Sequence, residues 1–340
     1  MNHISSIVST VAAAAVAVTL ASCSDSGSGT TEVRNCGATV SFDHVPENVT
    51  LLKSAAVPTL QHLGVLDRVH AKAGVFPTGY YDDATNSALA AVPSITDKLN
   101  PEGHVQVSRE EVVATGADLV LGATDTVNAQ TLASSHIPLI EEPAFCGALD
   151  EPANWDDVWD QIRLYGTVFD RGQDADSYIS ELQERLESLP GPAEGAPRPR
   201  VAVLYPTPGG GTTYAYGAGS MATPVVEKAG GENVFADSAD RVFEVSAEEI
   251  VDRNPDVVIA LHSAESGPDD GDAMVAAVTA LPGMDRTTAG QGHRIMPLML
   301  NYAEPPTPLA VDGVEKVAGF LRDGSATGPS TEAEAPGDAG

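Results

Sequence analysis

The chain has 340 residues, which is long enough for two domains of ordinary size, and 42% of them are hydrophobic. It carries 48 acidic and 18 basic residues, so its formal net charge is −30. A surface of that sign repels nucleic acid and anionic lipid headgroups, which excludes both as binding partners.

The amino-terminal segment has the composition of an export signal. Residues 1–22 contain no Lys, Arg, Asp or Glu, and residues 7–20 are mostly Ala, Val, Ser and Thr. The run is shorter than the ~20 apolar residues that span a bilayer, so it predicts a signal peptide. It ends in Leu20-Ala-Ser-Cys23, which resembles a bacterial lipobox and implies that Cys23 is lipid-modified in the mature protein. An ordinary signal peptide followed by a coincidental cysteine is the alternative.

A short polar segment follows the signal. Residues 24–31 are Ser, Gly and Thr with one Asp, and we expect residues 23–34 to form a flexible, lipidated tether. Two more cysteines, Cys36 and Cys146, occur in the chain. Because exported proteins meet an oxidising environment, we predict a Cys36–Cys146 disulfide, with two buried free thiols as the alternative.

Residues 35–152 have the pattern of an α/β lobe. Apolar segments at 48–52, 69–74, 118–121 and 137–140 predict strands. Helices are expected between them, near 55–63, 108–115 and 127–134. Strands that alternate with helices indicate a mostly parallel sheet.

Residues 153–192 form a helical connection in this prediction. Helices are expected at 155–169 and 174–189, and Pro190-Gly-Pro192 ends the second one. One face of that second helix is apolar: Ala175, Tyr178, Ile179, Leu182, Leu186 and Leu189. A helix of this length spans roughly 24 Å and can cross from one lobe to another. Packing of the same helix on a single sheet is the alternative, and the pattern leaves both open.

Residues 193–323 repeat the α/β pattern, and 324–340 are expected to be a disordered tail rich in Ala, Gly, Pro and Glu. Strands are predicted at 200–205, 213–216, 256–261 and 294–298. Helices are predicted near 221–229, 247–253, 272–281 and 308–321.

An internal repeat connects the two lobes. Residues 107–122 align without gaps onto residues 245–260, and seven of the sixteen positions are identical. Ser108 and Ser246 are candidate helix N-caps, and Glu111 and Glu249 stand where they would complete capping boxes. An all-apolar strand follows the helix within each copy. The repeat therefore predicts two similar lobes.

Several segments together resemble the helical-backbone (class III) substrate-binding proteins of ABC importers for ferric siderophores, haem and cobalamin. The resemblance covers about residues 35–321. It rests on Pro46-Glu-Asn-Val-Thr-Leu-Leu52 with residues 59–69, on 107–121, on Ala229-Gly-Gly-Glu-Asn-Val234, on 245–259, and on Leu281-Pro-Gly-Met284 with 292–295. It implies two Rossmann-like lobes with mostly parallel sheets, joined by one long helix, with the ligand between them.

The resemblance also implies partners. A monomeric binding lipoprotein on the outer face of the cell membrane would deliver its ligand to an ABC permease dimer and its ATPase. One glutamate on each lobe would dock on the permease, and Glu110 and Glu248 match those positions. Because Glu111 and Glu249 are expected in capping boxes, Glu110 and Glu248 stay free to project. Acidic residues that simply favour a helix N-terminus are the alternative.

Ligands of open α/β sheets bind beyond the carboxyl ends of the strands. We therefore expect ligand contacts in the loops that follow the predicted strands, where aromatic and polar side chains are concentrated. The candidates are Lys53, Phe76, Tyr80, Tyr81, Thr124, Tyr214, Tyr216, Arg241, Phe243, His262, Asn301 and Tyr302, with Ser54 and Asp125 beside them. Lys53 or Arg241 would pair with an anionic group of the ligand. The family usually has Trp near 241–243 and after the last strand, where this chain has Phe243 and Tyr302.

No motif indicates an enzyme. GxSxG, HExxH and GxxxxGK[ST] are absent from the sequence, and Gly217-Ala-Gly-Ser-Met-Ala222 is interpreted as a turn that opens a helix. No catalytic residue, metal site or resident cofactor is predicted. The expected function is binding of an iron–siderophore complex as cargo. The alternatives are cobalamin, haem or another cofactor-like anion, or Zn²⁺ or Mn²⁺ in a metal importer, although the histidines lack HxH or HxxxH spacing.

Overall fold

The structure is a computed structural model that describes residues 30–100, 104–149, 152–189, 191, 195, 197–207, 209–263 and 270–323. The signal peptide expected at 1–22, the lipidation site Cys23 and the tail expected at 324–340 lie outside the described residues.

The amino-terminal lobe is built on a five-stranded parallel sheet with the order β5-β4-β3-β6-β7. Strands β3 and β6 are buried along their whole length, which explains the all-apolar Leu-Val-Leu sequence of β6. The strands are β3 Val49–Leu51, β4 Val69–Ala73, β5 Ser94–Thr96, β6 Leu119–Leu121 and β7 Leu139–Ile140. The helices are α1 Val57–His62, α2 Asp83–Ala91, α3 Arg109–Ala114 and α4 Ala129–Leu132, with 3-10 turns η1 Leu66–Arg68, η2 Thr78–Tyr80, η3 Ala133–Ser135 and η4 Pro143–Phe145.

The carboxy-terminal lobe has a six-stranded sheet with the order β11-β9-β8-β12-β13, and β10 pairs with β8. The pairs formed among β8, β12 and β13 are parallel, whereas β9 and β11 add an antiparallel edge. The strands are β8 Arg200–Tyr205, β9 Thr213–Tyr216, β10 Glu232–Asn233, β11 Val242–Val245, β12 Val257–His262 and β13 Ile295–Met299. The helices are α7 Ala222–Lys228, α8 Ala247–Arg253, α9 Asp270–Thr279, α10 Thr288–Gln291 and α11 Leu309–Asp323, with 3-10 turns η5 Met284–Arg286 and η6 Leu300–Tyr302.

The two lobes share one arrangement of strands. In the first, β6 lies between β3 and β7, and in the second, β12 lies between β8 and β13. The repeated sequence forms α3 and β6 in one lobe and α8 and β12 in the other. This confirms the predicted fold of two α/β lobes with mostly parallel sheets.

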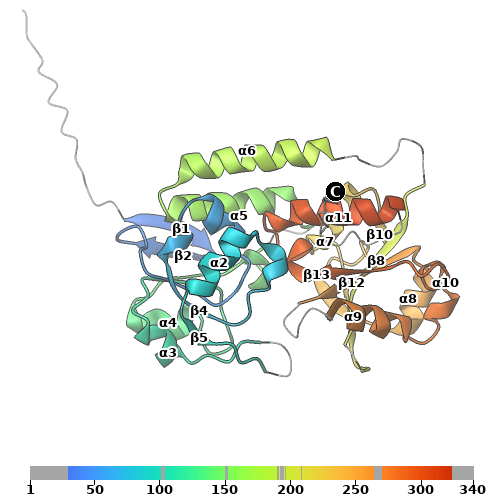
Figure 1. Cartoon of the computed structure of the whole chain (residues 1–340), viewed down its shortest axis with the longest axis horizontal. Coiled ribbons are helices and arrows are strands. Elements are labelled where there is room, and N and C mark those ends of the chain that lie inside the picture. Colours follow the sequence, from blue (N-terminus) through green and yellow to red (C-terminus); the bar gives the residue numbers. More distant parts are fainter. Residues whose placement is uncertain are drawn as a thin grey trace, which may run out of the picture.

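Two helices connect the lobes, α5 Trp155–Val168 and α6 Gly172–Ser188. In Figure 1, α6 lies across the top of the molecule, above α5 and beside α11. Its Tyr178 ring stacks on His62 of α1 in the first lobe, with 3.6 Å between ring centroids. Its Arg185 pairs with Glu315 and Asp312 of α11 in the second lobe. The helix therefore contacts both lobes, as the crossing alternative predicted.

A hairpin at the start of the folded chain is missing from the prediction. Strands β1 Thr31–Asn35 and β2 Ala38–Phe42 pair with each other and form a separate two-stranded sheet. The two-residue turn uses positive φ angles at Cys36 (50°) and Gly37 (76°), which suits a tight hairpin. The expected tether boundary at residue 34 is therefore too late, because β1 begins at Thr31.

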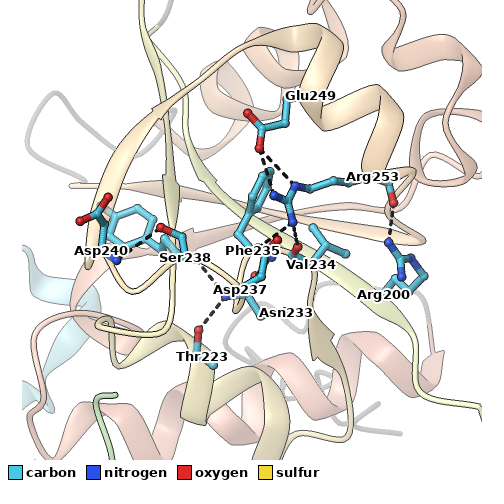
Figure 2. A network of polar contacts seen from close by, with 11 residues as sticks. Arg200, Thr223, Asn233, Val234, Phe235, Asp237, Ser238, Asp240, Glu249 and Arg253 are labelled. Carbon is cyan, nitrogen blue, oxygen red and sulfur yellow. Dashed lines mark hydrogen bonds and ion pairs between the residues drawn. The ribbon is translucent and has the colours of Figure 1, made fainter. Parts of the chain in front are cut away.

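The capping boxes differ between the repeats. Ser108 and Glu111 form a complete box at α3, as predicted. At α8, Ser246 accepts the Glu249 backbone N–H, but the Glu249 carboxylate pairs with Arg253 at 3.1 Å instead. Figure 2 shows why: the Arg253 guanidinium also binds Asp237 and the Val234 carbonyl. The second capping box predicted from the sequence is therefore wrong.

Candidate ligand-binding site

A cavity of about 480 Å³ lies between the lobes and is lined by both of them. Most of its lining residues follow the carboxyl ends of β3, β4, β6, β7, β12 and β13, which is where open α/β sheets bind ligands. The residues that carry the polar and aromatic groups are Lys53, Ser54, His104, Thr124, Asp125, Glu141, Phe145, Tyr205, Ser263 and Asn301.

Lys53 reaches the cavity because a glycine lies beside it. Gly122, directly after β6, has φ +90°, and a Cβ there would lie 2.8 Å from Lys53 Cγ. A larger residue at position 122 would push the lysine stem aside. The close approach of the two strand ends thus depends on the glycine.

Glu141 is a buried carboxylate at the wall of the cavity. Burial raises its pKa, and the Lys53 charge and backbone N–H groups of Ala123 and Glu142 act in the opposite direction. The wall therefore holds one lysine ammonium and one desolvated carboxyl close together.

Phe145 brings together cations from both lobes. Lys53 Nζ lies 4.3 Å from the centroid of the Phe145 ring, and the Arg241 guanidinium carbon lies 5.7 Å from it. Arg241 also pairs at 3.1 Å with Glu304, whose side chain is 1% exposed. Burial raises the pKa of Glu304, and Arg241 opposes that shift. Arg241 is thus engaged by its own lobe.

Direct hydrogen bonds join the lobes beside the cavity. Asn301 Nδ2 donates to Ser54 Oγ at 3.0 Å, and the Tyr302 hydroxyl donates to the Gly79 carbonyl at 2.7 Å. Asn301 and Ser54 both line the cavity, so they fix the distance between its two walls.

Comparison with known proteins gives a consistent assignment. The model of the periplasmic binding protein family matches residues 49–299. The chain belongs to the periplasmic binding protein family. It is 43% identical to a solved protein of an ABC-type Fe³⁺-hydroxamate transport system from Saccharomonospora viridis, with a TM-score of 0.79 over 85% of this chain and 98% of that one. No curated protein matches the sequence.

Two more distant structures share the fold. A periplasmic binding protein from Veillonella parvula is 17% identical, with a TM-score of 0.70 over 88% of this chain and 99% of that one. The haem-binding protein RhuT from Roseiflexus is 18% identical, with a TM-score of 0.61 over 82% and 98% of the two chains. The resemblance to substrate-binding proteins of ABC importers is confirmed, and this periplasmic binding protein is a solute binder rather than an enzyme.

The structure places three of the predicted ligand residues of the binding protein in the cavity lining: Lys53, Thr124 and Asn301, with Ser54 and Asp125 beside them. The aromatic candidates lie elsewhere. Tyr80 and Tyr302 are buried where the lobes meet, Tyr81 donates to the Ser54 carbonyl at 3.1 Å, and Phe76 packs against the core.

Apart from Asn301, the candidates in the second lobe do not line the cavity. Tyr216 and His262 are buried, and the Phe243 ring packs on Phe235 with centroids 5.8 Å apart. Tyr214 is exposed on β9. The Arg241 guanidinium lies over the Phe145 ring without lining the cavity.

Glu141, Phe145 and Tyr205 line the cavity but were not predicted. The strand-end rule would have included Glu141, because it directly follows the predicted strand 137–140, and Tyr205, because it ends the predicted strand 200–205. No sequence signal marks Phe145, which enters the cavity from a 3-10 turn.

Glu110 and Glu248 occupy matching places, each two residues after the N-cap of its helix. Both are exposed, and Glu110 is 78% exposed with a 3.4 Å contact to Arg109. In Figure 1, α3 and α8 lie in different lobes, both on the side away from α6.

Neither a membrane-spanning helix nor a cluster of metal ligands occurs in the described part of the binding protein. Within it, no helix is long and apolar enough to cross a bilayer. Across the same residues, no group of three or more His, Cys, Asp and Glu side chains is placed to hold a metal ion. The Cys36–Cys146 disulfide predicted from the sequence is present.

Proposed function

We propose that this protein captures an iron(III) chelate of the hydroxamate class between its lobes and delivers it to an ABC permease and its ATPase. The observation that carries the proposal is the cavity of about 480 Å³ lined by strand ends of both lobes. The 43% identity with a protein of an Fe³⁺-hydroxamate transport system, over 98% of that chain, supports the choice of cargo. The chelate is cargo, and no resident cofactor is part of the proposal.

The charges around the cavity support an uncharged or cationic chelate. The lining of the cavity includes the ammonium of Lys53 and the carboxyls of Asp125 and Glu141, and His104 lies 3.7 Å from Asp125. Three hydroxamates neutralise iron(III), whereas three catecholates leave a charge of −3. Desolvating a trianion beside two carboxyls is unfavourable, because one ammonium cannot balance it. Arg241, which we expected to pair with an anionic ligand, is held by Glu304.

Delivery requires a place at the membrane and a docking surface. In this proposal the protein is a monomer held on the outer face of the cell membrane by a lipid on Cys23, which the lipobox-like Leu20-Ala-Ser-Cys23 supports. Glu110 and Glu248 dock on the permease, one from each lobe. Their exposure and their matching places in the repeat support that role.

Titration of the purified protein tests the choice of cargo. Iron(III)-desferrioxamine, an iron(III) tris-catecholate, haem, cobalamin and Zn²⁺ are added separately while intrinsic fluorescence is followed. We expect iron(III)-desferrioxamine to quench the signal with the lowest Kd, and Phe145→Ala to raise that Kd by about tenfold through the loss of an apolar contact. Tyr214→Ala is the matched control, because Tyr214 is outside the cavity lining. Tighter binding of the tris-catecholate, haem, cobalamin or Zn²⁺ than of iron(III)-desferrioxamine would replace the proposed cargo.

A further inference from the structure

We propose that the β1–β2 hairpin is a brace for the ligand site, which sets the position of residues 141–146 and thereby of Glu141 and Phe145. The inference rests on the proposed function for its effect on ligand affinity. The hairpin pairs with neither lobe's sheet. Its contacts with the rest of the protein are therefore not those of an added strand.

The first attachment is a buried side chain. Asn35, at the end of β1, is 6% exposed. Its Nδ2 donates to the Glu141 carbonyl at 2.8 Å, and its Oδ1 accepts the Glu141 backbone N–H at 3.0 Å. The amide thus satisfies both backbone groups of one residue that is 106 positions away. A side chain that imitates a neighbouring strand in this way fixes the place of Glu141 at the cavity wall.

The second attachment is covalent. Cys36, the next residue, forms the disulfide with Cys146, which directly follows Phe145. The hairpin itself is fixed by Val33 and Phe42, which are buried in the core of the protein. The segment 141–146 is therefore tied at its first and last residues to an element that the core holds in place.

The side chains of residues 141–146 point in two directions. The Glu142 carboxylate accepts the Tyr165 hydroxyl at 2.9 Å and lies within 3.4 Å of Gln161 Nε2, so it points toward α5. Glu141 and Phe145 line the cavity instead. A shift of this turn would move the Phe145 ring, and with it the surface over which Lys53 and Arg241 lie. Loosening the hairpin thus changes the ligand site at Phe145 and at Lys53, which both line the cavity.

A double-mutant cycle separates positioning from general stability. Asn35→Ala leaves the Glu141 backbone groups without their partner, and we expect it to raise the Kd for iron(III)-desferrioxamine by about tenfold. In a Phe145→Ala background the same substitution should change the Kd by less, about threefold, because the ring is already absent and only the displacement of Glu141 remains. Equal effects of Asn35→Ala in the two backgrounds, or no effect in the first, would overturn the brace.

Asn48→Ala is the matched control. Asn48 also ties distant segments of the first lobe, because its Nδ2 donates to the Gly116 carbonyl at 2.8 Å, but it lies at the opposite end of β3 from the cavity. We expect it to alter thermal stability while the Kd changes less than twofold. A change in Kd as large as that of Asn35→Ala would mean that any loss of stability weakens binding, and would overturn the positioning role.

Amide hydrogen exchange gives a readout that needs no ligand. The Phe145 N–H donates to the Glu142 carbonyl at 2.8 Å, and the Ala148 N–H donates to the Pro143 carbonyl at 3.0 Å. In Asn35→Ala, and in wild type after reduction of the disulfide, these two amides should exchange at least tenfold faster while those of β6 and β12 keep their rates. Unchanged exchange at both amides would refute the brace. A wild-type protein that binds none of the tested compounds would refute the proposed function alone, and the exchange result would still decide the brace.

Discussion

The hydroxyl of Tyr80 in the first lobe accepts the backbone N–H of Asn301 in the second lobe at 2.9 Å. The Tyr80 ring also packs edge-on against Tyr302, with centroids 5.2 Å apart. Both tyrosines were predicted to bind ligand, and in the structure they instead join the lobes beside the cavity. Aromatic residues after strand ends therefore serve here as a seam, which holds the two walls of the cavity at a fixed separation.

Removing one hydroxyl of this seam should weaken the protein measurably. Tyr302→Phe deletes the hydrogen bond to the Gly79 carbonyl, a part-buried contact between the two lobes. We expect the free energy of unfolding to fall by about 1–2 kcal/mol, measured by urea denaturation. Tyr214→Phe is the control, because Tyr214 is exposed and should change stability by less than about 0.5 kcal/mol. Equal stabilities of the two variants would show that the seam contributes nothing.

Charge reversal at the proposed docking residues should separate transport from binding. Glu110→Lys with Glu248→Lys is expected to abolish uptake of the radiolabelled iron chelate by cells, because each substitution places a cation against a permease surface that suits carboxylates. The Kd in solution should stay within about twofold of wild type, since neither residue lines the cavity.

Glu47→Lys with Glu232→Lys is the control for net charge. Both residues are exposed, one in each lobe, and the change in charge is the same. This control should transport normally. If the docking variant retains uptake, or if the control loses it to the same degree, the assignment of Glu110 and Glu248 is incorrect.

The sequence predicted the parts of the fold that depend on local pattern. Strands β8 and β12 consist mostly of consecutive apolar residues, and helix α8 begins after a Ser N-cap. All three elements were therefore predicted to within one residue of their bounds. The β1–β2 hairpin was not found. Its strands alternate weakly, and its turn is stabilised by a disulfide to a residue 110 positions away. Helix α2 was missed although Asp82 caps it, because its apolar face is short.

Among the residues that line the cavity, only some that closely follow the ends of strands were predicted. Lys53, Thr124 and Asn301 directly follow the ends of strands or nearly so, and all three line the cavity. Phe145 could not be predicted, because its position depends on Asn35, on the disulfide and on α5, which are brought together by tertiary structure. The role of Tyr302 likewise depends on how closely the lobes approach.

Replacement of Cys23 tests the lipid anchor. If the lipobox-like sequence is processed as we propose, Cys23→Ala removes the attachment site for the lipid, and the protein should move from the membrane fraction to the medium or to the soluble fraction. Immunoblots of separated fractions measure the distribution, and ligand binding by the released protein shows that it is folded. Retention of the variant in the membrane fraction would rule out an anchor at this cysteine.

Glu142 should give the protein an unusual dependence of stability on pH. Complete burial raises the pKa of this carboxyl to about 7 in the native state, from 4.5 as the ordinary value. The neighbouring Glu141 raises it further, while hydrogen bonds from Tyr165 and Gln161 and the charge of Lys53 lower it. Between these two pKa values the native state holds more protons than the unfolded state. The free energy of unfolding must therefore fall as the pH rises through this range.

Glu142→Gln removes the titration and keeps an acceptor for the Tyr165 hydroxyl. Relative to wild type, the variant should gain stability as the pH rises from 4.5 to 7.5, by about 3 kcal/mol at most, since each unit of pKa corresponds to about 1.4 kcal/mol. Urea denaturation at intervals of pH measures the difference. Glu110→Gln, at an exposed position, should run parallel to wild type. If Glu142→Gln also runs parallel, the Glu142 carboxyl is ionised throughout this range, and α5 is held to the ligand-site turn by a charged rather than a neutral group.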